Sequence, residues 1–218
     1  MKARTRGPTS EVMSTYVYLL VTLVPSVVLH EVSHGYVAYL FGDPTAKENH
    51  RLTLNPLRHV DPFGSVLLPI LLIYSGLPAF GYAKPVPVNF ARLRNPRRQS
   101  LYVSLVGPAV NLVLSAVGYT ICEIAIHSVQ SQALLNFGVY LGLVNLTLGV
   151  FNLVPIPPLD GSAIIERLLP RRHLPSYYRF RAMALPLVMV LVILDSFTFH
   201  VGANVFLHLQ NWWLGLLV

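Results

Sequence analysis

Residues 21–41 read VTLVPSVVLHEVSHGYVAYLF, a mostly apolar stretch that is long enough to cross a lipid bilayer as a helix. His30 and His34 lie four residues apart and therefore project from the same face of that helix. Two imidazoles placed in this way can bind one Zn²⁺ ion, and Glu31 between them is placed to act as a general base toward water. Ionisable residues at membrane depth are costly and usually functional. The stretch therefore predicts a hydrolytic metal site inside a membrane-spanning helix.

The composition of the chain is typical of a membrane protein. Of its 218 residues, 54% are hydrophobic and 11% are charged, whereas an ordinary soluble domain has roughly 25% charged residues. So few charges cannot cover the surface of a soluble fold of this size, and we predict an all-α polytopic membrane protein. The single cysteine, Cys122, excludes a disulfide framework and a multi-thiolate metal site. A zinc ion must therefore be held by histidine and carboxylate side chains.

The hydrophobic pattern predicts four membrane spans within one domain, at 12–41, 99–122, 131–159 and 182–199. Residues 65–78 are short for a full crossing and contain two prolines, which favours a re-entrant segment. The tail at 201–218 either crosses the membrane or lies flat, with Trp212 and Trp213 as interfacial anchors. We therefore expect four to six membrane-spanning or re-entrant helices in a single domain, 1–218, with a catalytic core over 12–170 and C-terminal helices over 180–218.

A third metal ligand is needed, because zinc in catalytic sites takes three protein ligands and keeps one position open. Asp160 is the best candidate, since it follows an uncharged run of nearly thirty residues. The prolines at 155, 157 and 158 forbid a continuous helix there, and Gly161 permits a tight turn that directs the carboxylate inward. The alternative is a solvated aspartate in a turn at the membrane exit. The pair of histidines, which lacks a carboxylate, favours the ligand.

The basic residues indicate an orientation in the membrane. The net charge of +7 could indicate a nucleic-acid partner, but the arginines lie in short loops at 92–98 and 167–181, which is typical of cytoplasmic loops. We therefore expect a lipid bilayer and no nucleic acid around the chain. The metal site then lies about 10 Å below the cytoplasmic surface, with the N-terminus outside and residues 63–79 dipping in and returning. Basic residues at positions 2, 4 and 6 favour the opposite orientation of the N-terminus.

Three motifs, in this order, resemble those of the site-2 protease family of intramembrane zinc metalloproteases: His30-Glu31-x-x-His34, Gly107-x-x-x-Asn111 and Asn152-x-x-Pro155-x-x-x-x-Asp160-Gly161. The match extends over residues 20–170. The resemblance implies one zinc ion per chain with His30, His34 and Asp160 as ligands and Glu31 as catalytic base. It places Asn152 near the site, where it steadies the water or the oxyanion.

The resemblance also implies weaker assignments. Gly107 and Asn111 would line the cavity, although a helix contact made by small residues accounts for them equally well. His59, at the mouth of the re-entrant segment, is a candidate to approach the site. Residues 81–90 contain prolines that favour extended backbone, and they resemble the family's re-entrant β-hairpin, which could hold a substrate by β-augmentation. The chain is too short for the PDZ or CBS domains of other members.

The expected function is hydrolysis of peptide bonds within or near the membrane spans of protein substrates, in the cell membrane of a prokaryote and nearer its cytoplasmic side. The oligomeric state stays open. One rival function, zinc binding or transport, predicts further carboxylates or histidines along the spans, and Asp195 is almost the only one. The other rival, a catalytically inactive membrane scaffold, predicts the loss of Glu31 or a ligand, and all are present.

Overall fold

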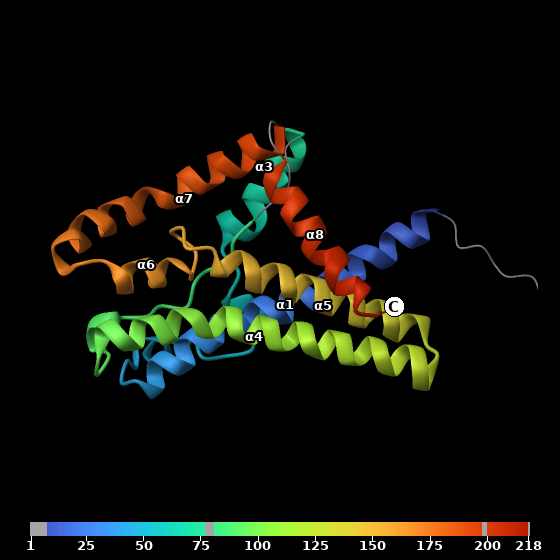
Figure 1. Ribbon diagram of the computed structural model, residues 1–218, viewed down its shortest axis with the longest axis horizontal. Helices are drawn as coiled ribbons and strands as arrows, with labels where there is room; N and C mark the ends of the chain where they lie inside the picture. The colour runs from blue at the N-terminus through green and yellow to red at the C-terminus, as the bar shows by residue number, and fades with distance from the viewer. Residues whose placement is uncertain (1–7, 77–80, 198–199, 218) are drawn as a thin grey trace, which may run out of the picture.

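Three long helices form the core of the molecule. The computed structural model describes residues 8–76, 81–197 and 200–217. Helices α1 (Pro8–Leu40), α4 (Pro96–Ile124) and α5 (Gln132–Leu153) pack against one another, with α4 and α5 side by side in Figure 1. A short π-helix, η4 (Ala125–Val129), continues α4 and leads into the turn before α5. Because every pair among α1, α4 and α5 is in contact, side chains from all three can meet in one buried site.

Within the described residues, four helices are long and apolar enough to cross a membrane, which confirms the predicted number of spans. The boundaries of α1 and α4 lie within four residues of the prediction, and the larger differences are at the other two helices. The third helix, α5, ends at Leu153 and not at residue 159, because the chain becomes extended at Val154, just before the first proline. The fourth, α7 (Leu174–Phe197), begins eight residues earlier than expected, since arginine is a good helix former and continues the helix into the basic loop.

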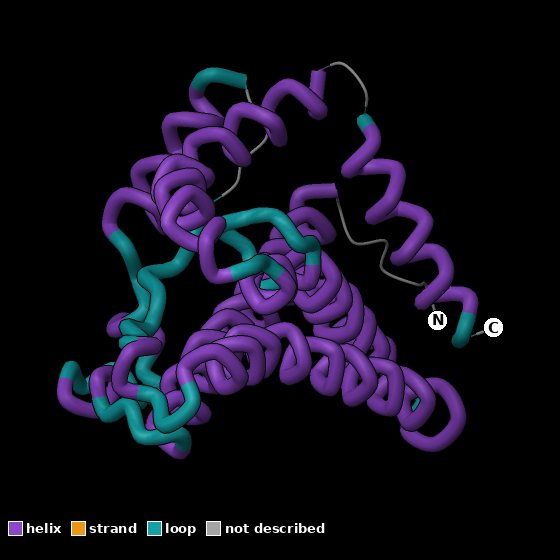
Figure 2. Tube along the Cα trace, turned by 60° about the vertical axis from the view of Figure 1, so that its left-hand side comes forward, coloured by secondary structure: helices purple, strands orange, loops and turns teal. Residues whose placement is uncertain are grey.

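Helices α7 and α8 (Val201–Gly215) stand apart from most of the core, as the two views in Figures 1 and 2 show. Helix α8 contacts both α7 and α5. Trp213 on α8 is buried with Cys122 and Leu146, so the prediction that it anchors the chain at the membrane interface is wrong. Trp212 is exposed.

The connection between α1 and α4 carries short helices. After α2 (Thr45–Glu48) and η1 (Pro56–Arg58), a π-helical turn, η2 (Pro62–Leu67), continues directly into α3 (Leu68–Tyr74). Asp61 starts this helix by accepting hydrogen bonds from the N–H groups of Phe63 and Gly64. The apolar helix Pro62–Tyr74 extends over about 20 Å, which is too short for a full crossing of a hydrocarbon core of about 30 Å.

Residues 81–89 are extended, but the predicted β-hairpin does not form: the described residues contain no strand. Pro85 and Pro87 have no N–H groups to give to a ladder. Four N–H groups of the segment bond to separate partners on different elements: those of Tyr82, Lys84, Val86 and Asn89 donate to Gly64, His59, Glu31 and Asp43. The segment is therefore extended but unpaired with a second strand, and it leads into η3 (Phe90–Arg92) and α4.

Candidate metal centre

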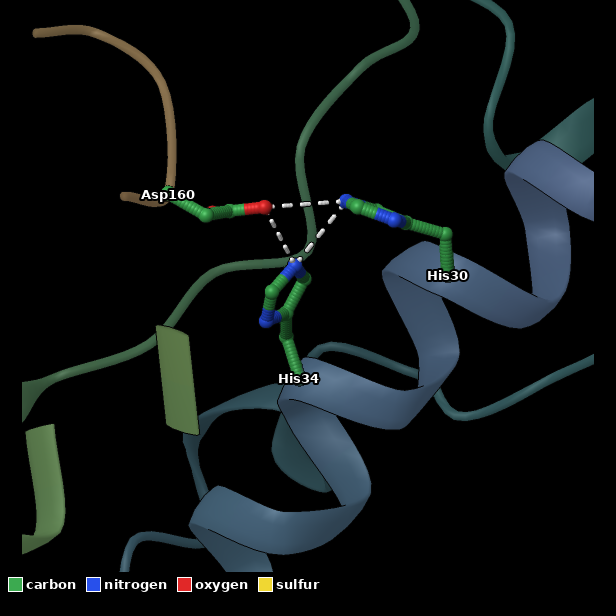
Figure 3. A group of neighbouring side chains, drawn as sticks. All are labelled: His30, His34 and Asp160. Carbon is green, nitrogen blue, oxygen red and sulfur yellow. Dashed lines mark hydrogen bonds and ion pairs between the residues drawn. The ribbon is translucent and has the colours of Figure 1, made fainter. Parts of the chain in front are cut away.

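Figure 3 shows three side chains that point toward one another, as the sequence predicted for His30, His34 and Asp160. The two Nε2 atoms are 3.1 Å apart, and Oδ2 of Asp160 is 3.1 Å from Nε2 of His30 and 3.3 Å from Nε2 of His34. Both imidazoles are buried, whereas the aspartate side chain is 22% exposed. Among the described residues, these three are the only group of metal-ligating side chains that converges in this way.

The helix α1 supplies both histidines from one face, one turn apart. Asp160 arrives from the irregular segment after α5. There the N–H of Gly161 donates to the carbonyl of Asn152 at 2.6 Å, which folds the chain back on the end of α5. A Cβ atom at position 161 would lie 2.1 Å from the Leu153 carbonyl oxygen, so only glycine permits this close return. The predicted proline break and glycine turn together place the carboxylate beside α1.

Hydrogen bonds fix the orientation of each imidazole from behind. His30 Nδ1 lies 2.5 Å from Asn111 Oδ1, and His34 Nδ1 lies 2.6 Å from the Val103 carbonyl oxygen. An oxygen of either kind accepts a hydrogen bond, so each Nδ1 carries the proton and each Nε2 presents a lone pair. Oδ2 of Asp160 is buried and has no hydrogen-bond partner. In the neutral imidazoles, three electron-rich atoms therefore face one another.

The geometry of the three atoms fits a zinc ion. Zinc binds histidine nitrogen and carboxylate oxygen at about 2.0–2.2 Å in a tetrahedron, which places neighbouring ligand atoms about 3.3–3.6 Å apart. The three separations here, 3.1, 3.1 and 3.3 Å, lie close to the lower end of this range. Three ligands with a fourth position open is also the arrangement of a catalytic zinc site rather than a structural one.

Helix α4 provides the wall behind the histidines. Val103, Gly107 and Asn111 are spaced four residues apart on one face of α4, so they follow one another along that face. Gly107 faces the imidazoles directly: a Cβ atom there would lie 2.4 Å from His34 Nε2 and 2.7 Å from His30 Cε1. The structure thus places Gly107 and Asn111, both predicted as cavity-lining residues, against the histidine pair.

Glu31 is held by the extended segment. Its Oε2 accepts a hydrogen bond of 2.9 Å from the N–H of Val86. Arg51, buried below this segment, donates to the Lys84 and Pro85 carbonyl oxygens at 2.8 and 3.4 Å. The position of the carboxylate next to His30 is therefore set by a chain segment more than fifty residues away.

Two predicted site residues have other contacts in the structure. Asn152 donates from Nδ2 to the Leu148 carbonyl oxygen, and its own carbonyl closes the turn at Gly161. His59 is buried; its Nε2 bonds to the Thr53 carbonyl oxygen, and its carbonyl accepts from the N–H of Lys84. His59 therefore supports the extended segment, and it is absent from the metal-ligating group found among the described residues.

Sequence reasoning missed Asn145, Arg51 and Val103. Asn145 had a usable signal, because an amide within an apolar span needs a polar partner. Arg51 had none, since a basic residue in a polar connection is ordinarily solvated. Val103 contributes only its main-chain carbonyl, and such a role depends on helix packing that the side chain does not reveal.

Comparison with known proteins agrees with this centre. Residues 120–194 match the model of peptidase family M50. The chain is 43% identical over 165 residues to "Putative zinc metalloprotease YwhC" of Bacillus subtilis, covering 72% of each chain. It is 34% identical over 154 residues to "Putative zinc metalloprotease Rip2" of Mycolicibacterium smegmatis, covering 71% of this chain and 58% of that relative.

A more distant relative is archaeal. The chain is 28% identical over 155 residues to "Zinc metalloprotease MJ0392" of Methanocaldococcus jannaschii, and it spans only 35% of that longer protein. No solved structure matches the chain significantly. The extent of the similarity to YwhC and the match to the family model show that the chain belongs to peptidase family M50, the site-2 protease family.

Proposed function

We propose that this protein is an intramembrane zinc metalloprotease that hydrolyses peptide bonds within or near the membrane spans of other proteins. The observation that carries the proposal is the triangle of His30, His34 and Asp160, whose three facing atoms are 3.1–3.3 Å apart, close to the spacing of ligand atoms around a tetrahedral zinc ion. Glu31, one residue from the first histidine, adds the carboxylate that hydrolysis needs.

Each residue of the proposed site has a separate role in hydrolysis. His30, His34 and Asp160 would hold the ion. A bound zinc ion supplies Lewis acidity, which lowers the pKa of water toward about 7 and polarises the scissile carbonyl. Glu31 takes a proton from the attacking water and passes it to the leaving amine. Asn152, at the end of α5, is proposed to steady the water or the oxyanion, with its side chain turned from the Leu148 carbonyl toward the substrate.

The apolar helices support a site within the bilayer. His34 lies six residues before Leu40, the last residue of α1, which corresponds to about 9 Å along the helix. Arginines gather before α4 and between α6 (Ser162–Leu168) and α7. The N–H of Arg94 donates to the Phe41 carbonyl oxygen just after α1, and Arg97 donates to the Arg167 and Leu169 carbonyl oxygens, so both arginine-rich stretches lie at the end of the core where α1 ends. We place this end at the cytoplasmic face of a prokaryotic membrane, because arginine-rich short loops favour that side.

The extended segment 81–89 is the proposed binding edge for the substrate. A helical substrate hides its peptide bonds in its own hydrogen bonds and must unwind before it can be cut. The segment is already extended and bonds directly to Glu31 through Val86. A substrate lying extended along it would therefore present its backbone beside the catalytic base, in the manner of strand addition.

Removal of the metal tests the proposed function. The purified protein in detergent should cleave a reporter that carries one apolar span, lose that activity when a chelator removes zinc, and regain it when Zn²⁺ is added back. Mass spectrometry of the two fragments should map the cut to the apolar span or its border. Cleavage by protein shown to be free of metal would contradict the zinc mechanism. Cuts confined to the water-exposed flanks of the reporter would contradict the intramembrane substrate.

Substitution of Val86 by proline tests how Glu31 is positioned. The change removes the N–H that donates to Glu31. We expect kcat to fall by about 10- to 100-fold, because a hydrogen bond to a charged group is worth about 1.5–3 kcal/mol. Zinc content should not change. Val86→Ala is the matched control, since it keeps the N–H and removes only the side chain. Equal losses in the two variants would assign the effect to side-chain packing.

A further inference from the structure

A buried chain of hydrogen bonds crosses all three core helices and ends on a proposed metal ligand. It runs from Ser26 on α1 to Asn145 on α5, then to Asn111 on α4, and returns to α1 at His30. The side chains of Asn111 and Asn145 are both 0% exposed, and Ser26 is 1% exposed. Amides are rare in apolar spans and must find partners there, so this chain requires an explanation.

The direction of each hydrogen bond in this chain follows from the main-chain carbonyl groups at its Ser26 and Asn145 end. Asn145 donates from Nδ2 to the Leu141 carbonyl oxygen at 2.9 Å, and a carbonyl oxygen can only accept. The same nitrogen donates to Ser26 Oγ at 2.7 Å, because the Ser26 hydroxyl proton is already given to the Thr22 carbonyl at 2.6 Å. The amide of Asn145 is thereby oriented, with its oxygen facing α4.

This orientation is passed on to the histidine. Asn145 Oδ1 accepts a hydrogen bond of 2.7 Å from Asn111 Nδ2, which turns Oδ1 of Asn111 toward His30. An oxygen at 2.5 Å from His30 Nδ1 can only accept, so Nδ1 must carry the proton. Nε2 is then left with its lone pair directed at Asp160 and His34, where the metal is proposed to lie.

We infer that Asn145 is a positioning residue, which acts through Asn111 to hold His30 in the tautomer that can bind a metal at Nε2. The inference rests on the proposed metal site. Without a metal, the Asp160 carboxylate 3.1 Å from Nε2 attracts a proton to that nitrogen, which favours the opposite tautomer. The hydrogen bonds between Asn145 and Asn111 and between Asn111 and His30 oppose this attraction. His34 needs no positioning side chain, because the main-chain carbonyl of Val103 cannot rotate and keeps the proton of His34 on Nδ1.

A purely structural role is the alternative for Asn145. Hydrogen bonds between membrane helices are worth about 0.6–2 kcal/mol each, so the amide chain also stabilises the packing of the three helices. That role predicts a change in stability and leaves the tautomer of His30 unaffected. The tautomer therefore separates the two roles, and it can be measured without any cleavage assay.

The experiment compares Asn145→Leu with Asn145→Asp by ¹⁵N NMR of histidine-labelled, metal-free protein in detergent, at a pH where the imidazoles are neutral. In the wild type, His30 should carry its proton on Nδ1. Leucine offers no acceptor, so Asn111 can rotate, and His30 should shift toward the Nε2–H form. Aspartate, ionised or neutral, still offers an oxygen to Asn111, so Asn145→Asp should keep the wild-type tautomer. His30→Gln assigns the signal, and His34 serves as an internal reference.

Metal binding gives a second measurement. Loss of an outer partner of a ligating histidine commonly weakens metal binding by about 10- to 100-fold, and we expect this loss of zinc affinity in Asn145→Leu, measured by competition with a chromophoric chelator. Ser26→Ala is the matched control, because the Leu141 carbonyl still orients Asn145. It should keep the His30 tautomer and zinc affinity.

Several results would overturn the inference. They are an Nε2–H form of His30 in the wild type, an unchanged tautomer in Asn145→Leu, or a switched tautomer in Asn145→Asp or Ser26→Ala. If Asn145→Leu does not fold, Asn145→Ala takes its place, because alanine also offers no acceptor to Asn111, and an unchanged His30 tautomer in that variant would overturn the inference. Failure of the proposed function would appear separately, as a lack of zinc-dependent cleavage in a wild type whose His30 has the expected tautomer.

Discussion

Glu31→Gln should abolish peptide cleavage while the protein still folds and binds zinc. Glutamine has nearly the same shape as glutamate, and its carbonyl oxygen can still accept the N–H of Val86. An amide, however, cannot take a proton from the attacking water. Proton transfer by a positioned side chain contributes about 10²- to 10⁴-fold to a rate, so we expect kcat to fall by that factor with little change in KM.

The measurement pairs initial rates on the span-containing reporter with the zinc content of the same sample. Glu48→Gln is a suitable control, because it makes the same chemical change outside the site. Glu48 lies on α2 in an exposed ion pair with Arg92. Its activity should match that of the wild type. Wild-type rates in Glu31→Gln would refute the assignment of Glu31 as base, and a variant without zinc would show that the glutamate supports the metal site.

Much of the fold could be predicted because each span carries its own signal. A long apolar run indicates a membrane helix whatever its neighbours are, and the described part of the chain contains four such helices. The histidine pair could be predicted for the same reason, since a spacing of four residues on a helix is local geometry. Asp160 could be predicted because prolines break the helix just before it, and the break is also local.

The partners of residues 81–89 could not be predicted, because they depend on tertiary contacts. The prolines correctly indicate extended backbone, but nothing in the segment shows whether its N–H groups face a second strand or other groups. In the structure they bond to Glu31, to Asp43 and to main-chain carbonyls of the α1–α4 connection. The buried Asp43 holds Asn89 in this way, and neither residue carries a pattern that would reveal the pairing.

The support behind the histidines was only partly predictable. Gly107 and Asn111 are four residues apart, and the family resemblance drew attention to both. Their functions depend on how α4 lies across α1, which places Asn111 opposite His30 and Val103 opposite His34. A helix contact between small residues and a metal-site wall were alternatives for Gly107; in the structure α4 meets α1 where the imidazoles lie, so this glycine is at the helix contact and also faces the proposed metal ligands.

Gly107→Ala should therefore destroy the metal site with a single methyl group. The added carbon would lie 2.4 Å from His34 Nε2 and 2.7 Å from His30 Cε1, closer than real carbon contacts allow. Neither imidazole can turn away freely, because Asn111 and Val103, one turn on either side of Gly107, hold their Nδ1 atoms. We expect zinc affinity to fall by more than about 100-fold, beyond the usual effect of an outer contact, and cleavage to become undetectable.

Two measurements check this expectation: the zinc affinity, determined by competition with a chelator, and the thermal unfolding of the metal-free protein. Alanine favours a helix over glycine by about 1 kcal/mol, so a loss of metal binding cannot come from weaker helix formation in α4. Gly215→Ala on α8 is the control, because a carbon added there would meet no atom within 4 Å. That variant should bind zinc as the wild type does. Normal zinc binding by Gly107→Ala would mean that α4 does not lie against the histidines, and the triangle would then lack the wall that holds its two imidazoles in place.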